Sequence, residues 1–250
     1  MVGMISINDT LSSINLFKTI SLSEMEKIKL MDRVDLKYVI PINRISEILD
    51  LMRFDYLIQK NDEKIISNYK TTYYDTIDYK MYLEHHNERY PRQKIRTRKY
   101  LDKNESYLEI KNKNNKKRTN KKRIEIDFIN QEKAINFINN TSNYKYEDLS
   151  PSIETNFSRI TIVNKSFKER ITIDFNIFFN NPRTNLNYNL DKIAILELKQ
   201  EGRESSKTKE ILNSLRIHPS SFSKSCIGQV LTNPDIKQNL FKTKIINTIK

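Results

Sequence analysis

Charged and apolar residues alternate along many short segments of this sequence, and this alternation constrains the fold more than any other feature. In KIRTRKY (94–100), a β-strand would place Lys94, Arg96 and Arg98 on one face and Ile95 and Thr97 on the other. Strands are predicted for the segments 33–40, 68–76, 94–100, 105–113, 120–128, 152–163, 169–177 and 193–200. The pattern therefore predicts about eight antiparallel strands with one polar and one apolar face.

Amphipathic helices are expected between these strands, at 21–31, 41–54, 131–140 and 205–215. Composition alone favours an open sheet with a solvated polar face. However, cations and carboxylates share nearly every polar face, and the helices match the apolar faces. We therefore predict an α+β fold: a closed eight-stranded antiparallel β-barrel, with a polar, basic interior and helices packed outside.

The charge balance indicates a polyanionic partner. The net charge is +13, from 44 Lys and Arg against 31 Asp and Glu. The chain has three glycines, too few and too dispersed for a P-loop or a dinucleotide fingerprint, so any phosphate must be held by side chains. One cysteine and three histidines argue against a disulfide framework and against a Cys- or His-based metal centre.

The chain lacks a segment that clearly divides it. We expect an N-terminal arm at 1–20, one domain at 21–232, and a basic, flexible tail at 233–250. The absence of an 18-residue apolar run predicts no transmembrane segment, and the N-terminus does not read as a signal peptide, so cytoplasmic localisation is the expectation. We interpret Tyr73, Tyr74 and Tyr82 as packing residues, and the basic segment 111–122 as a solvated hairpin tip rather than a nucleic-acid site.

An ordered series of motifs resembles the VTC domain, the polyphosphate polymerase branch of the triphosphate tunnel metalloenzymes (CYTH-like superfamily). The resemblance covers residues 24 to 232. Its motifs are RVDLKY (33–38), YYDT (73–76), HHN (85–87), KIRTRKY (94–100), EIK (109–111), RITID (170–174), ELK (197–199) and Ser223-Lys224, with Tyr82 between the second and third.

This resemblance implies a metal-dependent enzyme that transfers the terminal phosphate of ATP to a growing inorganic polyphosphate chain and releases ADP. ATP and polyphosphate would be the partners, with no nucleic acid, and Mn²⁺ or Mg²⁺ would be the cofactor. By motif, the catalytic residues would be Lys37, Arg96, Arg98, Lys111 and Lys199. The phosphate-binding residues would be Lys121, Arg159, Arg170, Ser223 and Lys224, and Glu197 would bind the metal.

The sequence differs from the sibling branch at one position and departs from the family pattern at two. Arg33 stands where the sibling triphosphatases carry a first carboxylate, which favours the polymerase branch. Phe157 replaces a tyrosine and Ser221 replaces a lysine, and both losses lie among the expected phosphate contacts. A triphosphatase and a catalytically weak module that binds polyphosphate or nucleotide therefore remain as alternatives.

Overall fold

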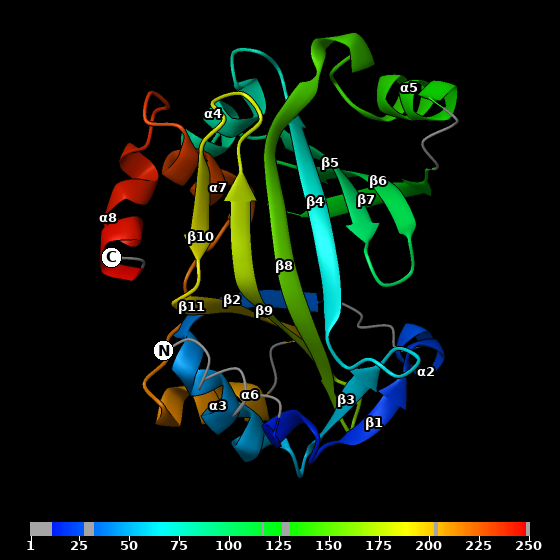
Figure 1. Cartoon of the computed structure of the whole chain (residues 1–250), viewed down its shortest axis with the longest axis vertical. Helices are drawn as coiled ribbons and strands as arrows, with labels where there is room; N and C mark the ends of the chain where they lie inside the picture. The colour runs from blue at the N-terminus through cyan, green and yellow to red at the C-terminus, as the bar shows by residue number, and fades with distance from the viewer. Residues whose placement is uncertain (1–11, 28–32, 117, 127–130, 203–204, 249–250) are drawn as a thin grey trace. The chain divides into compact units, whose positions relative to one another are not determined.

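The computed structural model describes residues 12–27, 33–116, 118–126, 131–202 and 205–248. The chain divides into two compact units. Unit 1 comprises Met1–Ser67, Phe157–Ile177 and Leu190–Phe222, and unit 2 comprises Asn68–Asn156, Phe178–Asn189 and Ser223–Lys250. Two long strands, β8 (Ser150–Asn164) and β9 (Glu169–Asn180), contribute residues to both units (Figure 1).

Unit 1 is built on a sheet in which β2 (Arg33–Pro41) pairs antiparallel with β11 (Ile193–Glu201), and β11 pairs antiparallel with β9. β9 neighbours β8, β3 (Tyr56–Lys60) pairs antiparallel with β8, and β1 (Lys18–Ser21) runs parallel to β3. The helices of unit 1 are α2 (Leu22–Lys27), a 3₁₀ turn (Ile42–Arg44), α3 (Ile45–Met52) and α6 (Lys207–Ser214).

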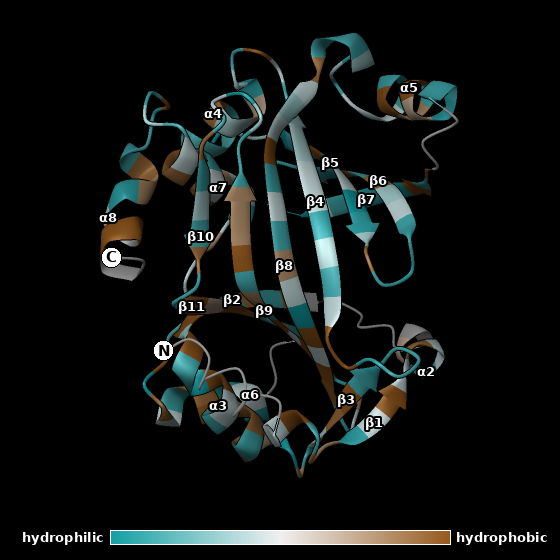
Figure 2. Ribbon diagram, viewed as in Figure 1, coloured by the Kyte–Doolittle hydropathy of each residue, from teal (hydrophilic) through white to brown (hydrophobic). Residues whose placement is uncertain are grey.

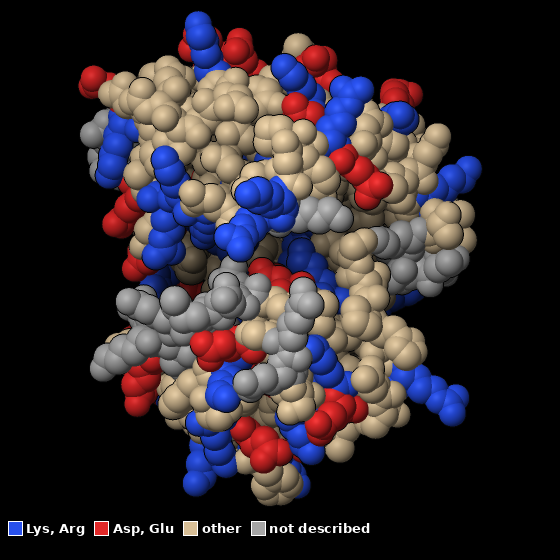
Figure 3. Space-filling model, turned by 180° about the vertical axis from the view of Figure 1, so that it is seen from behind, with Lys and Arg blue, Asp and Glu red and all other residues tan. Residues whose placement is uncertain are grey.

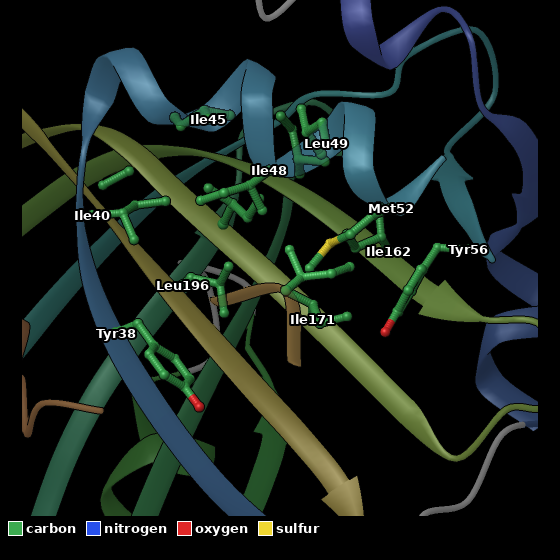
Figure 4. Packing of buried hydrophobic residues seen from close by; sticks show 14 of the residues in the cluster. Tyr38, Ile40, Ile45, Ile48, Leu49, Met52, Tyr56, Ile162, Ile171 and Leu196 are labelled. Atoms are coloured by element: carbon green, nitrogen blue, oxygen red, sulfur yellow. The ribbon is translucent and has the colours of Figure 1, made fainter. Parts of the chain in front are cut away.

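One apolar cluster holds unit 1 together. Tyr38, Ile171 and Leu196 of the sheet lie in the same buried cluster as Ile48 and Met52 of α3 (Figure 4). All five side chains are at most 1% exposed. Because strand residues alternate between faces, the charged neighbours of these residues must lie on the opposite face of the sheet. This alternation is visible along β8 as changes in hydropathy (Figure 2).

Unit 2 contains β4 (Ser67–Asp75), β5 (Arg92–Tyr100), β6 (Glu105–Lys113) and β7 (Thr119–Glu125), in the order β8-β4-β5-β6-β7. β10 (Asn187–Leu190) pairs with β9. The helices are α4 (Lys80–His86), α5 (Gln131–Thr141), a 3₁₀ turn (Tyr146–Asp148), α7 (Lys224–Thr232) and α8 (Asn239–Thr248). Ile95, Leu108 and Ile110 form the apolar face, and Met81 of α4 and Ile138 of α5 pack in the same cluster.

The predicted closed barrel is wrong. The strand order is β2-β11-β9-β8-β4-β5-β6-β7, and within the described residues no pairing joins β2 to β7. The physical reason lies in β7, where Lys121, Lys122 and Arg123 follow one another and place cations on both faces. These side chains are exposed, and because Lys122 shares its face with the half-buried Ile124, neither face of β7 is wholly apolar. A strand of this kind is typical of the edge of a sheet.

A strand lies in each of the eight segments predicted as strands, whereas the ends of the helices differ. Residues 127–128 of one predicted strand and 28–31 of the first predicted helix lie outside the described residues. The helix predicted from Pro41 begins at Ile45, because Pro41 still pairs with Ile193 as the last residue of β2. β1, β3, β10, α4, α7 and α8 were not expected, and α8 lies within the predicted tail. Within the described part of the chain, no helix combines the length and apolar character needed to cross a bilayer.

Candidate functional site

The polar face of the unit 1 sheet carries a mixed set of cations and carboxylates, here called face 1. Face 1 consists of Asp35, Lys37, Arg159, Arg170, Thr172, Asp174, Glu197 and Lys199. In the strand ladder, Lys37 lies opposite Glu197, which lies opposite Thr172. One pleat further, Asp35 lies opposite Lys199. The register thus places opposite charges across β2 and β11, whereas the β9 partners of Glu197 and Lys199 are Thr172 and Arg170.

Glu197 is held as an ionised carboxylate. Burial raises the pKa of this carboxyl, but the charges of Lys199, Lys37 and Arg159 outweigh burial and lower the pKa well below its ordinary value. The Lys199 ammonium donates to Glu197 Oε1. The pKa of Lys199 is itself lowered, because burial outweighs the attraction of Glu197 and Asp35. Glu197 therefore offers a charged oxygen ligand at neutral pH.

The other cations of face 1 already have partners within unit 1. Arg159 binds Asp174 through two parallel hydrogen bonds of 2.5 and 2.8 Å, and its guanidinium carbon lies 5.3 Å from the centre of the Phe157 ring. Lys37 Nζ donates to the Phe222 carbonyl at 2.9 Å. An incoming phosphate would thus have to compete with a carboxylate for Arg159.

Face 1 also tests whether a divalent metal would fit. Among the described residues, no cluster of three His, Cys, Asp or Glu side chains is suited to hold an ion. Thr172 Oγ1, opposite Glu197, is buried without a hydrogen-bond partner. Carboxylate and hydroxyl oxygens suit Mg²⁺ or Mn²⁺, and Mg²⁺ in particular is commonly held by one or two carboxylates together with substrate phosphates. The donor set therefore fits an ion that the protein and its substrate hold jointly.

The polar face of the unit 2 sheet is much more basic, and we call it face 2. Face 2 consists of Tyr73, Lys94, Arg96, Arg98, Glu109, Lys111, Lys121 and Arg123. Arg96 lies opposite Tyr73 on one neighbouring strand and opposite Glu109 on the other. By the same register Glu105 and Glu125 also lie on this face, which therefore carries six cations against one buried carboxylate, Glu109, and two less buried ones. The excess of cations suits a ligand with several negative charges.

Glu109 is the central counter-ion of face 2. Its side chain is fully buried, and it accepts hydrogen bonds from Arg96 Nε at 2.7 Å and from Lys121 Nζ. Burial raises the pKa of Glu109, but Arg96, Arg98 and Lys121 together bring it down to about 2. The carboxylate thus fixes the positions of Arg96 and Lys121.

Tyr73 has an unusually acidic hydroxyl. Burial raises its pKa, but the charges of Arg96, Arg98, Lys94 and Lys224 outweigh burial and lower the pKa to about 8. Arg96 Nη1 donates to the Tyr73 hydroxyl at 3.1 Å. Tyr73 is therefore part of the cationic site, rather than the packing residue that we predicted.

The start of α7 adjoins face 2. Lys94 Nζ donates to Ser223 Oγ at 2.9 Å and to Ser225 Oγ at 3.0 Å, and Ser223 caps the helix by accepting from the Cys226 amide. Tyr73, Lys94 and Ser225 also line a cavity of about 30 Å³, enough for roughly one water molecule. Amide groups at a helix start, next to an ammonium group, favour an anion.

The predicted residues fall into two groups. Unit 1 holds Lys37, Arg159, Arg170, Glu197 and Lys199, and unit 2 holds Arg96, Arg98, Lys111, Lys121, Ser223 and Lys224. Sequence reasoning missed the roles of Lys94, Glu109, Thr172 and Asp174. The alternation of strand residues already placed Lys94 on the same face as Arg96, and the Glu-x-Lys spacing drew attention to Glu109. The sequence did not show which cations Glu109 binds. The side chain of Arg33 lies outside the described residues.

The exposed charges do not form one basic patch on the side of the molecule seen in Figure 3, where lysines and arginines are interspersed with acidic residues. The expectation that nucleic acid is not a partner stays a prediction.

Comparison with known proteins places this chain in a family. No curated protein matches the chain. Among solved structures, a Hippeastrum protein named for adenylyl cyclase and described as having a dominant triphosphatase activity aligns with a TM-score of 0.52 and 11% identity, covering 80% of this chain and 96% of its own. A Vibrio parahaemolyticus protein assigned to the adenylate cyclases has a TM-score of 0.45 and 10% identity, covering 76% and 94%. A Pyrococcus horikoshii protein has a TM-score of 0.45 and 13% identity, covering 79% and 98%.

The likeness to the Hippeastrum protein concerns the fold. A sequence profile of the VTC domain matches residues 32–232, which is most of the chain and nearly the range of the motifs in the sequence. The protein is therefore a member of the VTC domain family.

Proposed function

We propose that this protein is a polyphosphate polymerase that transfers the γ-phosphate of ATP to the end of an inorganic polyphosphate chain and releases ADP. The observation that carries the proposal is face 2, where six cations surround one buried carboxylate. Repeating phosphate groups offer one or more negative charges each, and arginine binds them through paired hydrogen bonds. Membership of the VTC domain family supports the same assignment.

In this reaction a terminal phosphate oxygen of the chain attacks the γ-phosphorus of ATP, and the bond from that phosphorus to the oxygen bridging the β-phosphate breaks. The acceptor oxygen is already ionised, so no general base is required. The protein must align the two reactants and neutralise the charge on the transferred group. Arg96 and Arg98 would bind the phosphoryl oxygens, with Lys94, Lys111 and Lys121 holding the neighbouring phosphates.

Face 1 would hold the divalent ion. Glu197 would bind it directly, and the Thr172 hydroxyl, which lies opposite Glu197 without a hydrogen-bond partner, would offer a second oxygen ligand. When bound, Mg²⁺ or Mn²⁺ supplies charge neutralisation on the phosphate oxygens. Lys37 and Lys199 flank this carboxylate, keep it ionised, and add positive charge for the phosphates.

A triphosphatase is the second candidate. The described activity of the Hippeastrum protein, which shares the fold, favours it. Such an enzyme would need an attacking water in place of the chain end. Phe157 favours the other alternative, a catalytically weak module that binds polyphosphate or nucleotide, because Phe157 offers the neighbouring Arg159 a ring but no hydroxyl group.

The experiment that tests the proposal measures polyphosphate made from ATP and Mn²⁺, by gel electrophoresis of the products. Arg98→Ala is the informative variant, because the hydrogen bonds from Arg96 and Lys121 to Glu109 stay in place. We expect this substitution to lower the rate by about 10²-fold. The matched control, Lys99→Ala/Lys122→Ala, removes two cations from the opposite face of β5 and β7 and should retain activity. Equal losses in the variant and the control would contradict the assignment to face 2.

A further inference from the structure

Two exposed aromatic side chains lie on neighbouring turns of unit 1. Phe54, between α3 and β3, is 70% exposed, and Phe167, between β8 and β9, is 43% exposed. The turns are joined by Lys165, whose amide donates to the Asp55 carbonyl at 3.0 Å and whose ammonium donates to the Phe54 carbonyl. We call residues 53–55 and 165–168 the aromatic tip.

The backbone holds these side chains at the surface. Phe167 has a φ of 60°, a left-handed conformation that is unusual for a bulky residue, and its amide donates to the Asn164 carbonyl at 2.9 Å. Phe54 lies under the Arg53 guanidinium, 4.7 Å from the ring centre. Both turns are thus fixed by local contacts, and a ring on a fixed turn loses little freedom when it binds a surface.

The charges around the tip are mainly positive. Lys165, Ser166 and Lys168 are exposed beside Phe167. The next residue, Glu169, is buried at 3% exposure, and its carboxylate accepts from the Tyr56 and Thr208 hydroxyls at 2.7 and 2.6 Å. This acid is therefore withdrawn from the surface of the tip. Asp55 is then the one exposed acid within the tip, against Arg53, Lys165 and Lys168.

We propose that the aromatic tip docks on the surface of an anionic lipid membrane. Phe54 and Phe167 would enter the boundary between headgroups and acyl chains, and Lys165 and Lys168 would contact the lipid phosphates. Aromatic rings with basic residues at their edge match this boundary, where one part of the surface is apolar and the next is negatively charged. Lysine stems extend along the apolar layer while their ammonium groups stay in the headgroups.

The absence of tryptophan from the sequence permits a direct test. Phe54→Trp and Phe167→Trp, made separately in the full chain, each introduce a single fluorescent reporter. With vesicles of phosphatidylcholine and phosphatidylglycerol, both should show a blue shift of emission and quenching by brominated lipid. The control Ile77→Trp, at an 81% exposed position in unit 2, should show neither effect.

Co-sedimentation with the same vesicles tests the energetics. Phe54→Ser/Phe167→Ser and Lys165→Gln/Lys168→Gln should each weaken binding by about tenfold or more. The control Lys103→Gln/Lys192→Gln removes two exposed lysines elsewhere and should bind as the wild type does. Binding that is unchanged by the phenylalanine variants would overturn the proposal, because it would reflect the net charge of +13 alone. A blue shift that grows with protein concentration in the absence of vesicles would also overturn it, and would indicate a second copy of the chain as the occupant.

Discussion

Replacement of Glu109 by glutamine tests how face 2 is held together. Glu109 has a pKa of about 2 in place of its ordinary 4.5, chiefly because Arg96, Arg98 and Lys121 outweigh the effect of burial. The carboxylate is fully buried, so this difference corresponds to about 3 kcal/mol of stability at neutral pH. We expect Glu109→Gln to lower the free energy of unfolding by about that amount, since its amide cannot neutralise the cations.

The stability that Glu109 contributes should depend on pH in a definite direction. Because folding depresses the pKa of Glu109, its contribution is fully present above pH 4.5 and is lost as the pH falls toward 2. The difference between wild type and Glu109→Gln should therefore be constant from pH 7 to about pH 5 and shrink below that range. Urea unfolding followed by tyrosine fluorescence measures it.

Two comparisons make the test decisive. Glu125→Gln, at an exposed position on β7, changes the charge equally and should alter stability by less than about 0.5 kcal/mol. Inorganic triphosphate should stabilise Glu109→Gln more than the wild type, because the anion replaces the missing negative charge. A loss below about 1 kcal/mol at pH 7 would refute the role of Glu109 as the central counter-ion.

Three further predictions follow from single side chains. Ultraviolet titration should show one tyrosine that ionises near pH 8 and is absent in Tyr73→Phe. The free energy of unfolding of the wild type, relative to this variant, should rise as the pH increases from 7 to 10. An absorbance of ionised tyrosine that does not change below pH 9 would contradict the electrostatics of face 2. Glu197→Gln should abolish the activation by Mn²⁺ while polyphosphate binding in EDTA persists, and calorimetry can separate the two effects. Gly228→Ala should destabilise the protein by about 1–3 kcal/mol, because its Cβ would lie 2.6 Å from Phe179 Cδ1, and an unchanged melting temperature would show that Phe179 can move aside.

Strand alternation made the individual strands predictable, because most of them have one apolar face that packs in a buried cluster. β5 shows this clearly, with Ile95 buried in the apolar cluster and Arg96 on the opposite face beside Glu109. Closure of the sheet could not be read in the same way. Alternation specifies faces, whereas closure depends on whether the terminal strands can pair, and the successive cations of β7 leave it at an edge.

The sequence predicted most of the cations of the candidate site, but it did not predict which carboxylates bind them. Arg159 was predicted as a phosphate contact, yet both of its parallel hydrogen bonds go to Asp174, fifteen residues away on the next strand. Glu109 likewise joins Arg96 and Lys121 from two different strands. Such pairings depend on strand register, which a single sequence leaves open. α4 was missed because Tyr79, the residue before its first turn, is in a left-handed conformation, and because its first amides are capped by Asp75 from the end of β4.

The central claim is the transfer of phosphate from ATP to a chain, and phosphorus NMR of the protein with ATP and Mn²⁺ tests it most directly. The account predicts a growing signal from internal polyphosphate phosphates, with one ADP released for each phosphate added and little orthophosphate. Orthophosphate equal to ADP, without any internal-phosphate signal, would contradict it and would identify a triphosphate-hydrolysing enzyme instead.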